Sequence, residues 1–327
     1  MQANVISIQE RFRGCLLGLA AGDAVGTTVE FKPRGTFEPV TDMIGQGPFA
    51  LKPGAWTDDT SMALCLATSL VHSRGFDAAD QMARYVRWYE TGYLSSTDRC
   101  FDIGNTTVRA LTRYKATGEV FAGSTRADTA GNGCLMRLAP IPMAYLGQGD
   151  RLLHYATESA RTTHGAPECL EASRLLADIL GRALSGPGQQ GSPGKDDVLF
   201  AQDARLGGSL QSQALVAVFA GDYRAKTRNQ IRGTGYVVQS LEAALWCFYT
   251  TASFESAILA AANLGDDADT TAAICGQVAG AFYGASGIPA HWLDRLIMRQ
   301  DIQTLADQLL ALSSALSASS ASSPSPA

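Results

Sequence analysis

The sequence is poor in charge and in histidine, and it contains no run that would cross a membrane. Charged residues make up 17% of the 327 positions, the net charge is −5, and no basic stripe is present. A nucleic-acid partner bound through its phosphates is therefore not indicated, because such proteins cluster lysine and arginine. No apolar signal core lies before Arg13, and no stretch of about 18 uncharged apolar residues occurs, so we expect neither a leader peptide nor a membrane partner.

The seven cysteines form no recognisable pattern. Their number is odd, they are scattered, and no Cys-x-x-Cys pair occurs. Several lie in apolar helical context, where cysteine behaves as a small hydrophobic residue. We interpret them as reduced core residues, which predicts a cytoplasmic protein.

Alternating strand patterns are weak, whereas apolar residues recur at helical spacing along most of the chain. Apolar residues reach 46% of the composition, which suits a compact helical globule with a large buried core. The fold class that we predict is all-α. The expected helices are 11–24, 57–73, 77–90, 104–117, 150–160, 167–184, 235–250, 253–263, 269–285 and 301–316.

The organisation that we expect is one domain over residues 1–312. The Gly/Pro/Ser-rich segment 185–195 is interpreted as a flexible insertion, and the Ser/Ala/Pro-rich residues 313–327 as a disordered tail. Gly14, Gly18 and Gly22 recur every fourth residue in the first helix. Each costs about 1 kcal/mol of helix propensity, which is tolerable if another helix approaches closely along that face.

Two acidic helix starts lie far apart in the sequence. The first is Gly-Ala-Trp-Thr-Asp-Asp-Thr-Ser-Met (54–62), and the second is Gly-Asp-Asp-Ala-Asp-Thr-Thr (265–271). Taken alone, each is a common capped helix start, with Thr57 or Asp58 as the cap of the first. Taken together, they could hold hard cations through oxygen ligands. The insertion lies between them, so this hypothesis requires that one domain contains both.

Several loops combine small residues with polar groups. Gly131-Asn132-Gly133 could bring backbone N–H groups to an anion, and Tyr236 follows a glycine-rich turn from which it could stack on a flat ring. His164 stands in a Thr-Thr-His-Gly turn, and Glu30 is a carboxylate in an apolar setting. Taken alone, the Gly-Asn-Gly turn, His164 and Tyr236 are more often structural, whereas Glu30 is equally compatible with either role. We interpret the other three histidines as structural.

These residues carry a resemblance that spans nearly the whole chain. The sequence resembles the ADP-ribosylglycohydrolase family, in particular the type that includes the bacterial dinitrogenase-reductase-activating glycohydrolase. The matching blocks are GCLLGLAAGDAVGTTVEF (14–31), GAWTDDTSMAL (54–64), FDIGNTT (101–107), GNGCLMRLAPI (131–141), TTH (162–164), GYVVQSLEAALW (235–246) and GDDADTTAAICGQVAGAFYG (265–284). Segment 185–232 lies outside the match.

The resemblance implies an orthogonal helical bundle that binds two Mg²⁺ or Mn²⁺ ions. The implied metal ligands are Thr57, Asp58, Asp59, Asp267, Asp269 and Thr270. Oxygen ligands suit these cations and argue against zinc, which prefers cysteine and histidine. Asp266 occupies a position that is glycine in some relatives, and we leave it outside the metal shell.

The remaining implications concern substrate and reaction. The implied substrate contacts are Asp102, Gly104, Gly131, Asn132, Gly133, His164 and Tyr236, and the implied catalytic residues are Glu30, Asp58 and Asp59. The predicted reaction hydrolyses the N-glycosidic bond between ADP-ribose and an arginine side chain of a modified protein, with ADP-ribose as product.

Three alternatives stay open at this point. One is the same hydrolysis at serine, a nucleobase or a small ADP-ribosyl metabolite. Another is an antagonist that binds and blocks an ADP-ribosyltransferase, which would then be a partner. The third is a structural relative similar to the crystallin that this family has provided to the eye lens.

Overall fold

The structure is a computed structural model that describes residues 6–186, 194–200 and 204–321. Within these ranges the chain is helical and contains no β-strand, only three isolated β-bridges. The all-α prediction is thus confirmed. None of the described helices has the length and apolar character needed to cross a bilayer.

The α-helices are α1 (Ile8–Gly26), α2 (Asp58–Ser73), α3 (Ala78–Thr91), α4 (Asn105–Thr117), α5 (Pro140–Ala144), α6 (Gly149–Arg161), α7 (Pro167–Ser185), α8 (Lys195–Phe200), α9 (Ala204–Gly207), α10 (Gln213–Ala220), α11 (Val237–Thr250), α12 (Phe254–Ala262), α13 (Ala268–Tyr283), α14 (Ala290–Arg295) and α15 (Arg299–Ala321). The short 3₁₀ helices are η1 (Thr27–Val29), η2 (Ala127–Thr129), η3 (Asn132–Cys134), η4 (Asp222–Ala225), η5 (Arg228–Gln230) and η6 (Ala285–Gly287).

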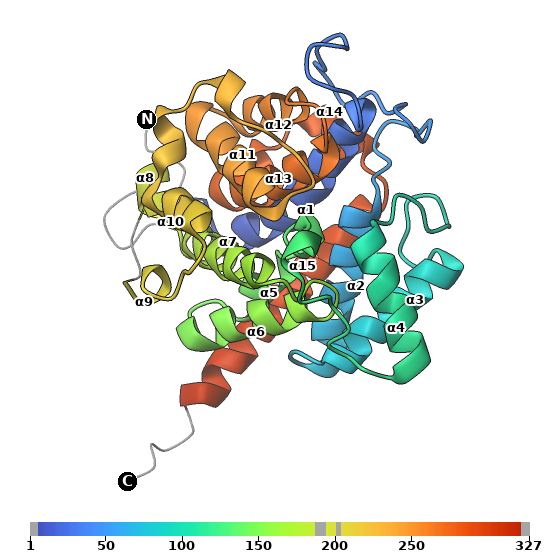
Figure 1. Ribbon diagram of the computed structural model, residues 1–327, viewed down its shortest axis with the longest axis vertical. Coiled ribbons are helices and arrows are strands. Elements are labelled where there is room, and N and C mark those ends of the chain that lie inside the picture. Colours follow the sequence, from blue (N-terminus) through green and yellow to red (C-terminus); the bar gives the residue numbers. More distant parts are fainter. Residues whose placement is uncertain (1–5, 187–193, 201–203, 322–327) are drawn as a thin grey trace.

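Helices α1 and α13 form the centre of the molecule and run antiparallel with their backbones in contact (Figure 1). A Cβ atom added to Gly14, Gly18 or Gly22 would lie 2.2–2.4 Å from a carbonyl oxygen of α13. The glycine row therefore exists because no side chain fits between the two helices, as the sequence predicted. Because the pair is antiparallel, the last turn of α1 meets the first turn of α13.

The remaining helices surround this pair and bury a continuous apolar core. Helices α7, α11, α12 and α15 pack against α1 or α13, and α2 packs against α15 and α3. A second apolar cluster lies between α2, α3 and α4, with Tyr85 and Trp88 fully buried in it. Helix α2 thus joins the central pair to the α3–α4 side of the molecule (Figure 1).

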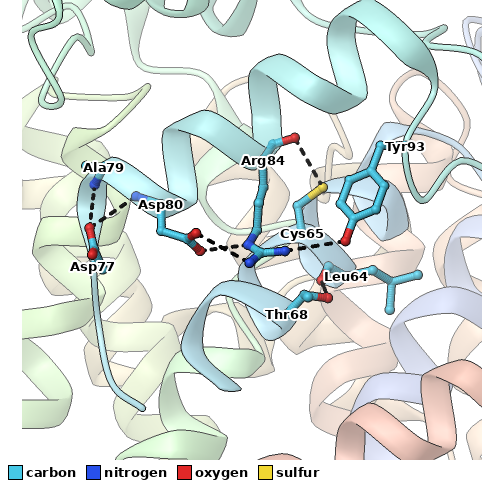
Figure 2. A network of polar contacts seen from close by, with 8 residues as sticks. All are labelled: Leu64, Cys65, Thr68, Asp77, Ala79, Asp80, Arg84 and Tyr93. Atoms are coloured by element: carbon cyan, nitrogen blue, oxygen red, sulfur yellow. Dashed lines mark hydrogen bonds and ion pairs between the residues drawn. The ribbon is translucent and has the colours of Figure 1, made fainter. Parts of the chain in front are cut away.

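Polar contacts stabilise α3 beside α2 (Figure 2). Asp77 caps α3 by accepting from the N–H groups of Ala79 and Asp80, at 2.9 and 3.1 Å. Within α3, Arg84 forms an ion pair with Asp80 at 2.6 Å. The carbonyl oxygen of Arg84 also accepts from the thiol of Cys65 on α2 at 3.7 Å, a weak contact between the two helices.

The structure departs from the expected elements at several boundaries and in several short helices; α1, for example, begins at Ile8 rather than at residue 11. Helix α15 continues to Ala321, so residues 313–321 of the expected tail are helical, and residues 322–327 lie outside the described residues. Two effects favour this extension of the helix. Alanine and leucine have high helix propensity, and the helix is anchored to the molecule because Ser313 is buried and Leu316 packs against the core. The sequence reading also missed the short helices α5, α8, α9, α10 and α14. Residues 187–193 of the expected insertion lie outside the described residues.

Candidate metal centre and catalytic cleft

Asp23, near the end of α1, organises the start of α2. One carboxylate oxygen accepts from the N–H and hydroxyl of Thr57, at 2.8 and 2.9 Å. The other accepts from the N–H and hydroxyl of Thr60, at 3.0 and 2.7 Å. We expected Thr57 or Asp58 to cap α2, but the Thr57 side chain makes no capping bond. Asp23 satisfies the free N–H groups instead, and it thereby fixes the position of the Asp-Asp pair.

The two acidic helix starts meet at this point. The hydroxyl of Thr57 lies 3.2 Å from a carboxylate oxygen of Asp269, and the hydroxyl of Thr270 donates to Asp59 at 3.3 Å. Asp58 and Asp59 occupy the first turn of α2, and Asp269 occupies that of α13. The positive ends of two helix dipoles therefore point at one group of carboxylates.

Seven carboxylates surround this meeting point and influence one another. Oxygen atoms of Asp23, Asp59 and Asp269 lie within 4.8 Å of one another, and so do oxygen atoms of Glu30, Asp102 and Asp269. Asp269 belongs to both groups. Asp58 and Asp267 complete the set, because their charges act on the pKa values of the other members.

The electrostatics of these seven carboxylates favour a bound cation. Burial, and then the charge of Asp269, raises the pKa of Asp59 well above its usual value. Burial raises the pKa of Asp23 to about 6 and that of Asp102 to about 7. One buried oxygen on each of Glu30, Asp59 and Asp102 has no hydrogen-bond partner. Anionic oxygens without donors are the ligands that Mg²⁺ and Mn²⁺ prefer, so the donor set fits a hard cation.

A cavity of about 1060 Å³ opens over the carboxylates. Its lining includes the acidic residues Glu30, Asp58, Asp102, Asp267 and Asp269 with Thr270, and also Gly131, Asn132, Gly133 and His164. Gly104 and Thr107, from the start of α4, line it too. Asn132 lies beside the acidic residues, because its side-chain amide donates to Asp267 at 2.7 Å. The volume lies just above the range of about 300–1,000 Å³ that is usual for small-molecule sites.

The glycines of the Gly131-Asn132-Gly133 turn make room for His164. A Cβ atom at Gly133 would lie 2.8 Å from the imidazole ring, and one at Gly131 would lie 3.5 Å from its Nε2. The ring therefore lies close against the turn, and His164 lines the cavity. The sequence predicted an anion cradle here, and the packing of His164 is a separate reason for glycine.

An aromatic rim borders the cavity on the side of Glu30 and Asp102. Phe31 is 63% exposed and has φ +61°, which is strained for a bulky residue. Its N–H donates to the carbonyl oxygen of Asp266 at 2.8 Å, which holds it there. Its ring contacts Phe49 edge-on at 6.3 Å between centroids, and Phe49 contacts Phe101 at 5.2 Å.

The predicted site residues do not all reach the cavity. Thr57 and Asp59 are fully buried beneath it and do not line it. Tyr236 is absent from the lining as well: it lies one residue beyond Gly235, which does line it, and its hydroxyl donates to Glu168 at 2.7 Å. Every other predicted metal, catalytic or substrate residue lines the cavity.

The sequence analysis missed Asp23, Phe31, Phe49 and Arg232. Asp23 had a usable signal, because it is the one charged residue in the apolar run of α1 between residues 14 and 26. Phe31, Phe49 and Arg232 line the cavity, but they come from loops whose paths the sequence pattern does not indicate.

Comparison with known proteins agrees with this geometry. The family model described as ADP-ribosylglycohydrolase matches residues 4–318. The chain is 44% identical to the ADP-ribosylarginine hydrolase Tri1 of Serratia proteamaculans (strain 568), over 92% of this chain and 79% of that protein. It is 33% identical to the ADP-ribosyl-[dinitrogen reductase] glycohydrolase of Rhodospirillum rubrum, over 94% and 97%. A solved structure, titled ADP-ribosylglycohydrolase-related protein complex, superposes with a TM-score of 0.82 at 45% identity, over 94% of this chain and 99% of that one.

Proposed function

This chain belongs to the ADP-ribosylglycohydrolase family, and from that premise we propose that it removes ADP-ribose from arginine side chains of modified proteins. The observation that carries the proposal is the set of seven carboxylates, including three unpartnered oxygens, beside a cavity of nucleotide size. The intact set argues against a purely structural role. The reduced cysteines fit a cytoplasmic site of action, since all seven are free.

We assign cation binding to the two acidic helix starts. Thr57, Asp58, Asp59, Asp267, Asp269 and Thr270 would hold two Mg²⁺ or Mn²⁺ ions, and Asp269 is the residue that both oxygen groups share. When bound, the ions supply positive charge that lowers the pKa of water and polarises oxygen atoms of the substrate. Asp23 positions these ligands through its bonds to the first turn of α2.

The chain's own residues account for the proton transfers. Asp58 lines the cavity whereas Asp59 is buried beneath it, so Asp58 is the better general base toward a water molecule. The water oxygen attacks the anomeric carbon, and the bond from that carbon to the guanidine nitrogen breaks. Glu30 and Asp102 have oxygen atoms within 4.8 Å of each other and line the cavity, and their raised pKa values would allow one of them to hold the proton that the departing nitrogen takes.

The rim of the cavity supports the arginine linkage. A guanidinium is a planar cation, and the cavity offers it two carboxylates, Glu30 and Asp102, beside the exposed ring of Phe31. A serine oxygen could take the same proton from Glu30 or Asp102, but it would not use the ring of Phe31. The name of the relative from Serratia, at 44% identity, points to the same linkage.

A panel of substrates tests the linkage. We expect ADP-ribose to be released in Mg²⁺ from a protein modified on arginine, at least about tenfold faster than from the same protein modified on serine. The control is the Asp269→Asn variant, which should release none from either. Faster release from serine would refute the arginine proposal, and no release from any ADP-ribosyl substrate would refute the hydrolase proposal.

A further inference from the structure

Arg137 is a buried cation that has no carboxylate partner in the part of the chain that the structure describes. Its side chain is 1% exposed. Its guanidinium lies over the ring of Tyr85 at 4.7 Å, and one of its nitrogens lies 3.7 Å from the sulfur of Met62. The other terminal nitrogen donates to the hydroxyl oxygen of Thr163 at 2.5 Å. A buried charge is costly unless it is paired or hydrogen-bonded, and Thr163 precedes His164, which lines the cavity.

The hydrogen bond from Arg137 determines to which atom the hydroxyl of Thr163 donates. A guanidinium only donates, so the Thr163 oxygen must accept from it. The same oxygen lies 2.7 Å from Nδ1 of His164, and among the described residues it has no other hydrogen-bond neighbour. If Nδ1 carried a proton, the fully buried Thr163 hydroxyl would have no acceptor, which is costly. The hydroxyl therefore donates to an unprotonated Nδ1.

The other ring nitrogen of His164 lies beside the glycine turn that lines the cavity. The imidazole lies against Gly131 and Gly133, and His164 belongs to the cavity lining. Within the described residues, no protein group forms a hydrogen bond with Nε2. With Nδ1 unprotonated, a neutral imidazole carries its proton on Nε2.

We propose that Arg137 and Thr163 are positioning residues that hold His164 as the neutral Nε2–H tautomer, which presents an N–H donor to an oxygen of the ligand. Burial, and then the charge of Arg137, lowers the pKa of His164 to about 3, which agrees with a neutral ring. The identity of the oxygen, a ribose hydroxyl or a phosphate oxygen of ADP-ribose, rests on the proposed function. The tautomer does not rest on it.

Nitrogen-15 NMR of the histidine side chains tests the tautomer in the ligand-free protein. The chain has only four histidines, and the signal lost in a His164→Gln variant assigns the ring. We expect His164 to show a protonated Nε2 and an unprotonated Nδ1, unchanged between pH 8 and pH 5. A protonated Nδ1, or a ring that becomes charged in this range, would overturn the proposal even if the protein proves to be an arginine hydrolase.

Matched variants of Thr163 test the role of the hydroxyl. Thr163→Val keeps the shape and removes the donor, so His164 should shift toward the Nδ1–H tautomer and ADP-ribose should bind at least about tenfold more weakly. Thr163→Ser keeps the donor and should retain both the tautomer and the affinity. An unchanged tautomer in folded Thr163→Val would contradict the proposal. If that variant does not fold, the wild-type and Thr163→Ser spectra still decide the question.

Discussion

Removing divalent cations should destabilise the protein, and the loss should depend on pH. Burial raises the pKa of Asp23 from 3.8 to about 6 and that of Asp102 to about 7. Above the usual carboxyl pKa, the cation-free folded protein therefore holds protons that the unfolded chain has released. Its stability must fall as the pH rises through this window, and it must recover as the pH falls toward 5. A bound cation neutralises the carboxylates instead and should remove most of this dependence.

The size of the destabilisation follows from the pKa shifts of the carboxyl groups and from the mass action of the bound cation. For Asp23 alone, a shift of about two pKa units corresponds to roughly 3 kcal/mol at pH 7. A cation at 100 times its Kd adds about 2.7 kcal/mol. Each kcal/mol moves the melting temperature of a chain of 327 residues by about 1.5 °C, from an unfolding entropy of about 2.1 cal/mol/K per residue. We therefore expect Mg²⁺ or Mn²⁺ to raise the melting temperature at pH 7.5 by about 4–8 °C relative to EDTA.

Thermal denaturation in EDTA and in Mg²⁺, between pH 5 and pH 8, measures this effect. Asp269→Asn should lose the cation-induced increase and should melt higher than wild type in EDTA, because one of the crowded charges is gone. The matched control is Asp128→Asn, which removes an exposed charge paired with Arg126 and should keep the full increase. Equal melting temperatures in EDTA and Mg²⁺, or a cation-free protein that loses stability as the pH falls from 7 to 5, would refute the reasoning.

Four further substitutions follow from named contacts. Asp23→Asn should weaken Mn²⁺ binding by about 10–100-fold in calorimetry, because Asp23 orients the ligands on α2; unchanged affinity would separate it from the metal site. Glu30→Gln should lower turnover at least about tenfold, about 1.4 kcal/mol, with the melting temperature unchanged or higher; a lower melting temperature with an unchanged rate per folded molecule would make Glu30 structural. Tyr236→Ala should weaken ADP-ribose binding by about 1–3 kcal/mol if the ring stacks on adenine. Tyr236→Phe should keep the affinity, although the protein should lose about 1 kcal/mol of stability with the hydrogen bond of the hydroxyl. Equal losses of affinity in the two variants would argue against stacking. Gly22→Ala places a Cβ 2.2 Å from a carbonyl oxygen of α13 and should cost about 3 kcal/mol or more in urea denaturation, unlike Gly149→Ala, where the space is open.

The sequence predicted those parts of the fold that depend on local pattern. Helical periodicity located the long helices, and the glycine row in α1 predicted the close approach that α13 makes. Helices α8, α9 and α10 were missed because each has only 4–8 residues, too few for a periodic pattern. The extension of α15 was missed because serine-rich composition favours disorder, whereas contact of Leu316 with the core favours helix.

The site was predictable where a motif supplied its own chemistry. Asp58 and Asp269 stand in acidic helix starts, and hard-cation chemistry predicts that such starts meet. Asp23 was missed because its role, capping a helix 34 residues away, exists only in three dimensions. Likewise, only the structure shows that Gly133 makes room for His164, and that Tyr236 bonds to Glu168. Side-chain partners from distant segments leave no local pattern in the sequence.

The most direct test of the account is reconstitution of a cation-free enzyme on an arginine-modified protein. After EDTA treatment and removal of the chelator, release of ADP-ribose should be absent, and it should return saturably as Mg²⁺ or Mn²⁺ is added to wild type but not to Asp269→Asn. Full release from the cation-free protein, or equal recovery in Asp269→Asn, would contradict the claim that the carboxylates around Asp269 bind the cations on which hydrolysis depends.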